Sequence, residues 1–126
     1  GGGGGAHDGA VYTLASDASA SPRLFSGGAD KRIHVWGLRT FDLQRTLAGH
    51  RSFVTALRAD RGLLLSASSD KALTVWHLGS YALLHTFTGH GGGIYSLAIH
   101  GGRACTGSLD RQVRVWPLPE KDTDIG

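Results

Sequence analysis

The sequence predicts an all-β protein that is built from a repeated unit of about 40 residues. Three tryptophans and three aspartates recur at this spacing, namely Trp36, Trp76 and Trp116, and Asp30, Asp70 and Asp110. Glycine accounts for 20 of the 126 residues, which favours many turns over a helical bundle. No segment combines helical spacing of apolar residues with capping residues, so we expect essentially no helix.

Further positions keep the same register. The Gly-His pairs at 49–50 and 89–90 are 40 residues apart, and His7 lies 43 residues before His50. The three additional residues fall in the small, polar stretch 16–22. A hydroxyl residue precedes each aspartate by four positions, at Ser26, Ser66 and Thr106. This agreement among four kinds of residue indicates three copies of one structural unit.

Each unit contains short runs rich in β-branched and aromatic residues, which predict strands. The first strand is expected at residues 11–14, 53–57 and 94–99. The second strand is expected at residues 23–27, 63–68 and 104–108. The third strand alternates apolar residues and ends at the tryptophan, at residues 32–36, 72–76 and 112–116. A weaker fourth strand is expected only at residues 43–48 and 83–88.

The link between the second and third strands is an aspartate followed by Lys or Arg. We place this aspartate at the first position of a type I turn, where its side chain accepts a hydrogen bond from the backbone two residues on. The cations that follow it are expected to be solvated turn residues; the alternative is that they form a basic track. They are Lys31, Lys71 and Arg111.

Four short strands in about 40 residues match one blade of a β-propeller. We therefore predict a propeller segment of about three four-stranded antiparallel blades, at residues 7–47, 48–87 and 88–118. Blade 3 lacks its outer strand, because the residues after Trp116 are polar and are interrupted by Pro117 and Pro119. Residues 1–6 are expected to be a flexible Gly-rich tail and residues 119–126 a polar tail.

Three blades alone do not close a ring, since propellers have about four to eight blades. An open segment leaves two sheet faces and several strand edges in water. We therefore expect this segment to be part of a larger ring. The remaining blades are expected from the parent chain or, in the competing interpretation, from a second copy that pairs with the first.

The Gly-His pair, the strand-two hydroxyl, the turn aspartate and the strand-three tryptophan together resemble the WD-repeat (WD40-type) β-propeller family over residues 7–118. This resemblance implies a hydrogen-bonded tetrad in each blade, formed by His7, Ser26, Asp30 and Trp36, by His50, Ser66, Asp70 and Trp76, and by His90, Thr106, Asp110 and Trp116. The chain departs from the family where an Asp usually follows the Trp, at Gly37, His77 and Pro117, and Ala6 replaces the first Gly.

The tetrads are expected to be structural, and no catalytic residue, cofactor or metal ligand is expected. An indole N–H only donates, a hydroxyl donates and accepts, and a histidine can relay to a carboxylate, so the chain of bonds satisfies buried polar groups. The Ser-His-Asp trios recur in every blade, whereas a hydrolase has one exposed nucleophile. The other histidines share no ligand spacing and are expected to be scattered surface and strand residues: His34, His77, His85 and His100.

Members of the WD-repeat family bind peptides or proteins on a top surface, formed by loops that join blades and loops that join strands two and three. The resemblance places nine residues there: Ala10, Tyr12, Ala29, Phe53, Thr55, Ser69, Gly93, Tyr95 and Leu109. None is charged, and aromatic residues are favoured at interface hot spots. A phosphopeptide receptor would place Arg here, so an apolar or aromatic motif is expected. The alternative is that some of these residues only fill gaps between blades.

We predict a non-enzymatic interaction scaffold that binds a peptide or protein. The net charge of +3 is scattered, so nucleic acid is not the expected partner. The alternative is a nucleic-acid-associated propeller that uses Arg39, Arg45, Arg51, Arg58 and Arg61. No apolar run is long enough to span a membrane, and the single Cys105 fits a reducing intracellular compartment, cytoplasm or nucleus. The short links at 59–62 and 101–103 resemble F-box and RING-type ubiquitin ligase propellers, which implies substrate recognition as a narrower alternative.

Overall fold

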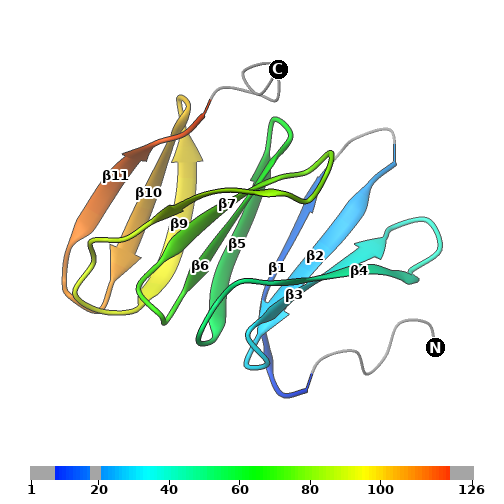
Figure 1. Cartoon of the computed structure of the whole chain (residues 1–126), viewed down its shortest axis with the longest axis horizontal. Helices are drawn as coiled ribbons and strands as arrows, with labels where there is room; N and C mark the ends of the chain where they lie inside the picture. Colours follow the sequence, from blue (N-terminus) through cyan, green and yellow to red (C-terminus); the bar gives the residue numbers. More distant parts are fainter. Residues whose placement is uncertain (1–7, 18–20, 120–126) are drawn as a thin grey trace.

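The computed structural model describes residues 8–17 and 21–119. Eleven strands and no helix occur in this part of the chain, which confirms the all-β prediction (Figure 1). Accordingly, no helix of the described residues has the length and apolar character needed to cross a membrane. The strands are β1 (Val11–Asp17), β2 (Arg23–Gly28), β3 (Arg32–Gly37), β4 (Leu43–Ala48), β5 (Val54–Asp60), β6 (Leu63–Ser68), β7 (Leu73–His77), β8 (Leu83–Phe87), β9 (Ile94–His100), β10 (Arg103–Ser108) and β11 (Val113–Pro117).

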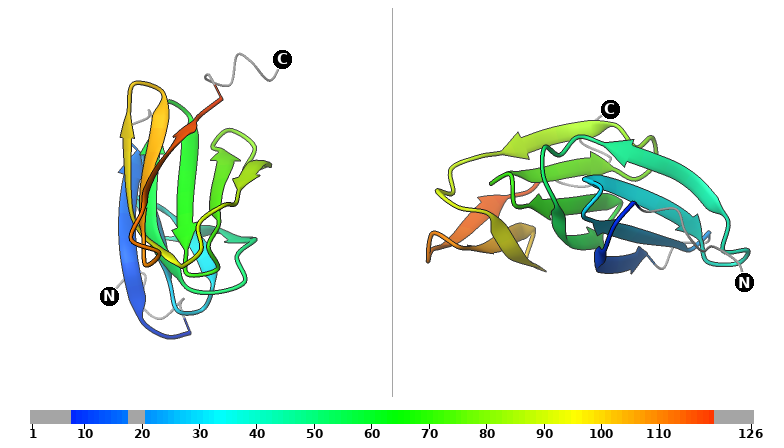
Figure 2. Two further views of the ribbon diagram at one scale, coloured as in Figure 1. Left: turned by 90° about the vertical axis from the view of Figure 1, so that its left-hand side faces the viewer. Right: turned by 90° about the horizontal axis from the view of Figure 1, so that it is seen from below.

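The strands form three antiparallel sheets that stand side by side as propeller blades (Figures 1 and 2). Their orders are β1-β2-β3-β4, β5-β6-β7-β8 and, within the described residues, β9-β10-β11. In each sheet the chain runs from an inner strand outward, and the view from below shows β4 and β8 on the outer side (Figure 2). The inner strands β1, β5 and β9 are neighbours, so the three sheets are a partial propeller.

The turns between the inner and second strands of blades 2 and 3 each contain two residues. Asp60 pairs with Leu63, and Arg61 and Gly62 between them have φ angles of 49° and 81°. Gly101 and Gly102 have φ angles of 57° and 75° in the corresponding turn of blade 3. Two consecutive positive φ angles define a type I′ turn, which matches the twist of the flanking strands.

The turn aspartate lies at a different position from the one predicted. The Lys71 N–H donates to the Ser68 carbonyl over 3.2 Å, so the β-turn runs from Ser68 to Lys71 and Asp70 is its third residue, not its first. The predicted contact is present, because Asp70 Oδ1 accepts the Ala72 N–H at 2.9 Å. Lys71 itself has a φ of 75°, a left-handed conformation that a lysine does not reveal in a sequence.

The apolar core lies between blades, as expected for units that bury their faces only against neighbours. The side chains between blades 1 and 2 come from both sheets and are Phe25, Ile33, Val35, Leu47, Val54, Leu57, Leu64, Trp76 and Leu78. The side chains between blades 2 and 3 are Leu63, Leu65, Ala67, Leu73, Val75, Ile94, Leu97 and Ala104. Each blade therefore depends on the next for stability.

The two end faces of the segment are open. Val75 is fully buried, whereas Val115, its equivalent 40 residues later, is 57% exposed. On the other side, Leu57 is 4% exposed, whereas its blade 1 equivalent, Leu14, is 61% exposed. Side chains that a neighbour covers in blade 2 thus face solvent at both ends, as in a segment of a larger ring.

Matched valine substitutions are expected to distinguish the covered face from the open one. Val75→Ala should lower the free energy of unfolding by about 2 kcal/mol, because it removes two buried methyl groups and leaves a cavity. Val115→Ala should change it by less than about 0.5 kcal/mol, because the side chain is exposed. Urea unfolding followed by circular dichroism measures both, and equal losses would contradict this packing.

Candidate functional site

A relay of hydrogen bonds links four side chains in blade 2. Trp76 Nε1–H donates to Ser66 Oγ over 2.9 Å, and Ser66 Oγ lies 2.6 Å from His50 Nε2. His50 Nδ1 lies 3.1 Å from Asp70 Oδ2. Because the carboxylate only accepts, His50 Nδ1 donates to Asp70, and Nε2 shares a hydrogen bond with the serine hydroxyl. The relay therefore connects β6 and β7 with the segment that leads into β5.

Blade 3 contains the same arrangement. Trp116 Nε1–H donates to Thr106 Oγ1 at 2.8 Å, Thr106 Oγ1 lies 2.7 Å from His90 Nε2, and His90 Nδ1 lies 2.9 Å from Asp110 Oδ2. Both histidines are buried, at 9% exposure for His50 and 5% for His90. The two relays therefore satisfy polar groups that would otherwise be buried without partners.

The aspartate at the end of each relay also holds backbone. Burial alone would raise the pKa of Asp70, but hydrogen bonds from His50 and from the N–H groups of Arg51 and Ala72 outweigh it and lower the pKa to about 2. Asp110 follows the same pattern, since bonds from His90 and the Gly91 N–H outweigh burial and hold its pKa well below its usual range. Both carboxylates are thus charged at neutral pH, and each fixes the loop that precedes the inner strand of its own sheet, β5 for Asp70 and β9 for Asp110.

Blade 1 differs because another histidine contacts its turn aspartate. Trp36 Nε1–H donates to Ser26 Oγ at 2.9 Å, as in the other blades. His34 Nε2 lies 3.2 Å from Asp30 Oδ2, and His34 Nδ1 lies 3.0 Å from Thr46 Oγ1. His7, the fourth predicted member, lies outside the described residues. His34 is 4% exposed and lies in β3, so among the scattered surface and strand histidines it is a buried strand residue.

The relays are not arranged for nucleophilic catalysis. Ser66 is fully buried, and its hydroxyl bonds both the indole and the imidazole, so no substrate can reach it. Within residues 8–17 and 21–119, no three His, Cys, Asp or Glu side chains gather where they could hold a metal ion. The relays thus link the strands and the loop of a blade, and they present no reactive group at its surface.

The residues that we placed on the top surface meet at one edge of the three sheets, the lower edge in Figure 1. We call it the Asp-turn edge, because it carries the turns of Asp30, Asp70 and Asp110. At this edge one backbone bond per blade joins two of the nine residues: Ala29 N–H to the Ala10 carbonyl at 2.9 Å, Ser69 N–H to Phe53 at 3.0 Å, and Leu109 N–H to Gly93 at 3.0 Å.

Four large side chains of this group are exposed. Tyr12 is 51% exposed, Phe53 41%, Tyr95 48% and Leu109 70%. Tyr12 and Phe53 belong to different blades, yet their ring centroids lie 5.8 Å apart with the planes tilted by 55°. Ala10 is also exposed. The edge therefore presents a row of apolar and aromatic side chains, and backbone hydrogen bonds hold the segments that carry them.

Other members of the group fill gaps between blades instead. Thr55 is half-buried, and its hydroxyl donates to the Ile94 carbonyl of the next blade. Gly93 is buried, and a Cβ atom there would lie 2.9 Å from Ser69 Cα, so only glycine allows blades 2 and 3 to approach this closely. Ser69 and Ala29 are half-buried, and the Ser69 hydroxyl bonds Ser52 at 2.6 Å.

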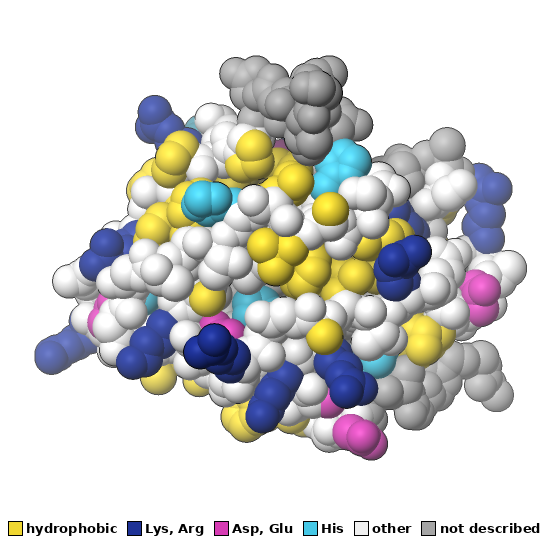
Figure 3. Space-filling view, in the orientation of Figure 1, with side chains coloured by type: hydrophobic (Ala, Val, Ile, Leu, Met, Phe, Trp, Pro, Cys, Tyr) yellow, Lys and Arg dark blue, Asp and Glu magenta, His cyan; other side chains and the backbone are white. Residues whose placement is uncertain are grey.

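Cations border the aromatic row, although none of the nine residues predicted for the top surface is charged. Lys31, Lys71, Arg111 and Arg51 are exposed residues of this edge, and Figure 3 shows Lys and Arg side chains along the lower margin of the molecule. Arg111 lines the same groove as Tyr95 and Leu109. We expected solvated turn residues, and the exposed positions agree, but Arg111 also borders an apolar groove.

Repeated radial sheets, each with a tryptophan indole that donates to a hydroxyl of the second strand, define a segment of a β-propeller. A family model described as "WD domain, G-beta repeat" (WD40) matches residues 5–37, 41–77 and 81–117. Because these matches cover most of the 126 residues, the chain belongs to the WD40 repeat family. WD40 propellers are generally protein-interaction scaffolds without enzymatic activity.

Two solved structures illustrate the similarity. The chain superposes on "Structure of U3-55K" and on "Crystal structure of RRP9 WD40 repeats", in both cases with a TM-score of 0.83 and 28% sequence identity. Each comparison covers 92% of this chain and 36% of the other chain. The chain therefore spans about a third of the length of these neighbours. The comparison with curated proteins gave no match.

Proposed function

We propose that this WD40 segment binds a peptide or protein through its Asp-turn edge. The observation that carries the proposal is a row of exposed aromatic and apolar side chains along all three blades. It consists of Tyr12 in blade 1, Phe53 in blade 2, and Tyr95 and Leu109 in blade 3. Such side chains contribute large contact area for little conformational entropy. Their backbones are held by cross-strand bonds and by the relays, so the surface is preorganised.

The same edge indicates the chemistry of the partner. The row itself is uncharged, which favours an apolar or aromatic side chain at the centre of the contact. Arg111 beside Tyr95 and Leu109 favours a carboxylate next to that side chain. We therefore propose that the partner presents an aromatic or aliphatic residue flanked by an acidic one.

A library of displayed peptides, selected against the full chain, tests the proposal. We expect selected peptides to be rich in aromatic and apolar residues and to lose at least about tenfold in affinity when Phe53 is replaced in Phe53→Ala. Phe41→Ala is the matched control, because Phe41 is 53% exposed but lies in the turn between β3 and β4. Equal binding by the two variants and the wild type would overturn the assignment.

Nucleic-acid association is the second candidate, and three of its five arginines lie on different parts of the segment. Arg45 lies on the outer strand β4, with its guanidinium 4.8 Å from the centre of the Tyr81 ring. Arg58 lies on the inner strand β5, and Arg51 lies on the Asp-turn edge. Phosphate-driven binding weakens steeply with salt, whereas apolar docking does not, so a salt titration of the bound partner separates the two.

We further propose an intracellular location, in cytoplasm or nucleus, which is supported by the single half-buried free thiol of Cys105. Substrate recognition within a ubiquitin ligase is a narrower proposal of the same kind, since it uses the same edge. The compact two-residue turns at Arg61-Gly62 and Gly101-Gly102 support that layout.

A further inference from the structure

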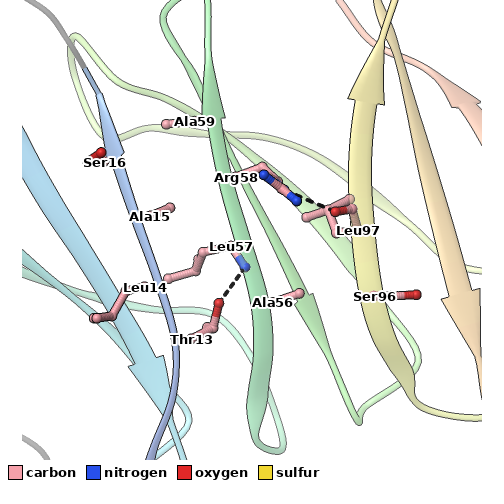
Figure 4. Close-up of a pocket in the computed structure, with 10 residues that line it drawn as sticks. All are labelled: Thr13, Leu14, Ala15, Ser16, Ala56, Leu57, Arg58, Ala59, Ser96 and Leu97. Atoms are coloured by element: carbon pink, nitrogen blue, oxygen red, sulfur yellow. Dashed lines mark hydrogen bonds between the residues drawn. The ribbon is translucent and has the colours of Figure 1, made fainter.

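The inner side of the segment contains a hollow that the Asp-turn edge does not include. It has a volume of about 560 Å³ and lies on the inner strands of all three blades, β1, β5 and β9. Small and hydroxyl side chains form most of its wall, and one cation enters it (Figure 4). Those that matter here are Thr13, Ala15, Ser16, Arg58, Ala59 and Ser96.

Arg58 has room because its structural equivalents are alanines. The same position of the inner strand is occupied by Ala15 in β1 and by Ala98 in β9, 43 residues before and 40 residues after Arg58. Among these three equivalent positions only blade 2 therefore carries a long, charged side chain. The free space on both sides is of the size that small ligands occupy in proteins.

The guanidinium is oriented but not neutralised. Arg58 Nε–H donates to the Leu97 carbonyl over 3.1 Å, which fixes the side chain across the boundary between blades 2 and 3 (Figure 4). Among the described residues, Arg58 forms no ion pair with a carboxylate. Its terminal Nη groups are therefore available as a forked pair of donors, the geometry that suits phosphate and carboxylate oxygens.

A further cation, Arg61, stands close to Arg58. A second hollow of about 350 Å³ shares Arg58 and Ala59 with the first and is also lined by Arg61 and His100. The one acid in its wall, Asp60, lies 3.9 Å from Arg61 and is 46% exposed at its side chain. Two arginines thus stand beside one carboxylate, which favours an anionic ligand group.

We propose that Arg58 anchors a phosphate group of a small molecule in this inner hollow. Arg58 binds two phosphate oxygens through Nη1 and Nη2, and Arg61 adds positive charge from the adjoining hollow. Thr13 Oγ1 accepts the Leu57 N–H at 3.1 Å and so can direct its own O–H into the hollow. The hollow shares Ser96 with the groove of the Asp-turn edge, but its anchor Arg58 does not line that groove, so the proposal does not depend on the proposed peptide binding.

Titration of the full, ¹⁵N-labelled chain with inorganic phosphate tests the proposal, with acetate as the carboxylate arm. We expect saturable shifts at Arg58, Ala15 and Ser96 with phosphate, and weaker binding of acetate. Arg58→Ala should weaken phosphate binding at least about tenfold, and Arg58→Lys should weaken it less because it keeps the charge. Arg51→Ala, an exposed arginine of the other edge, should leave it unchanged.

Three outcomes of the phosphate titration would overturn the proposal. Shifts that do not saturate, that persist in Arg58→Ala, or that Arg51→Ala removes to the same extent would show only general attraction to a basic chain. Stronger binding of acetate than of phosphate would overturn the ligand class. Circular dichroism and urea unfolding of each variant establish whether it is folded. If Arg58→Ala does not fold, Arg58→Lys provides a second variant for the comparison.

Discussion

Replacing Trp76 by alanine is expected to lower the free energy of unfolding by about 3–5 kcal/mol. The indole is 4% exposed and packs in the cluster between blades 1 and 2. Its N–H donates to Ser66 Oγ at 2.9 Å, so the substitution also deprives a buried hydroxyl of its donor. Urea unfolding followed by far-ultraviolet circular dichroism measures the loss without relying on tryptophan fluorescence.

Trp36→Ala is the matched control for that experiment. Trp36 occupies the same position in blade 1 and makes the same bond, to Ser26 Oγ at 2.9 Å. It is only half-buried, because it belongs to the open end of the segment. Its loss should therefore cost clearly less than the loss of Trp76. Equal costs would mean that lateral packing between blades does not determine the stability.

Asp70→Asn is expected to lower stability at neutral pH by about 1–3 kcal/mol and to remove part of its acid dependence. The carboxylate accepts bonds from His50 and from the N–H groups of Arg51 and Ala72, and an amide cannot accept them all. In the folded protein its pKa is about 2, below the value of 3.8 for a free aspartate. A carboxyl group with a lowered folded pKa stabilises the fold above its unfolded pKa and loses this contribution as the pH falls toward the folded pKa.

The contribution of Asp70 should therefore be complete above about pH 5 and should decline between about pH 4 and pH 2. Urea unfolding at a series of pH values should show the wild type and Asp70→Asn converging as the pH approaches 2. Asp60→Asn serves as the control, because Asp60 is exposed and, in the described part of the chain, accepts no hydrogen bond from a histidine. A constant difference between the wild type and Asp70→Asn from pH 7 to pH 2 would contradict the relay as described.

The repeat made the sheets predictable. The strands that flank each turn aspartate follow from a short apolar run, a turn and a tryptophan, and the structure places β2 and β3, β6 and β7, and β10 and β11 there. The open ends were also predictable, because each unit needs a neighbour and three units leave two faces free. Local sequence pattern and packing favour the same strands in this chain, and the sheets can be predicted from the sequence for that reason.

Other features depend on tertiary contacts that no local pattern contains. His34 contacts Asp30 and Thr46 because blade 1 pairs β3 with β4, and the only signal in the sequence is its distance of four residues from Asp30. Thr55 and Gly93 occupy expected binding positions but serve the contact between blades 2 and 3. The sequence analysis named Arg58 only among five scattered arginines, whereas its position in a hollow of the inner strands and its bond to the Leu97 carbonyl come from neighbouring blades. In each case the decisive neighbour lies on another strand or blade.

Hydrogen exchange at the indole N–H groups tests most directly whether each blade is locked through its tryptophan. In a chain labelled with ¹⁵N at tryptophan, we expect the Trp76 indole proton to exchange only when the whole protein unfolds, because it is buried and bonded to Ser66. The Trp36 proton, at the open end, should exchange faster. Immediate exchange of the Trp76 proton under native conditions would show that the relay does not form and would contradict the account.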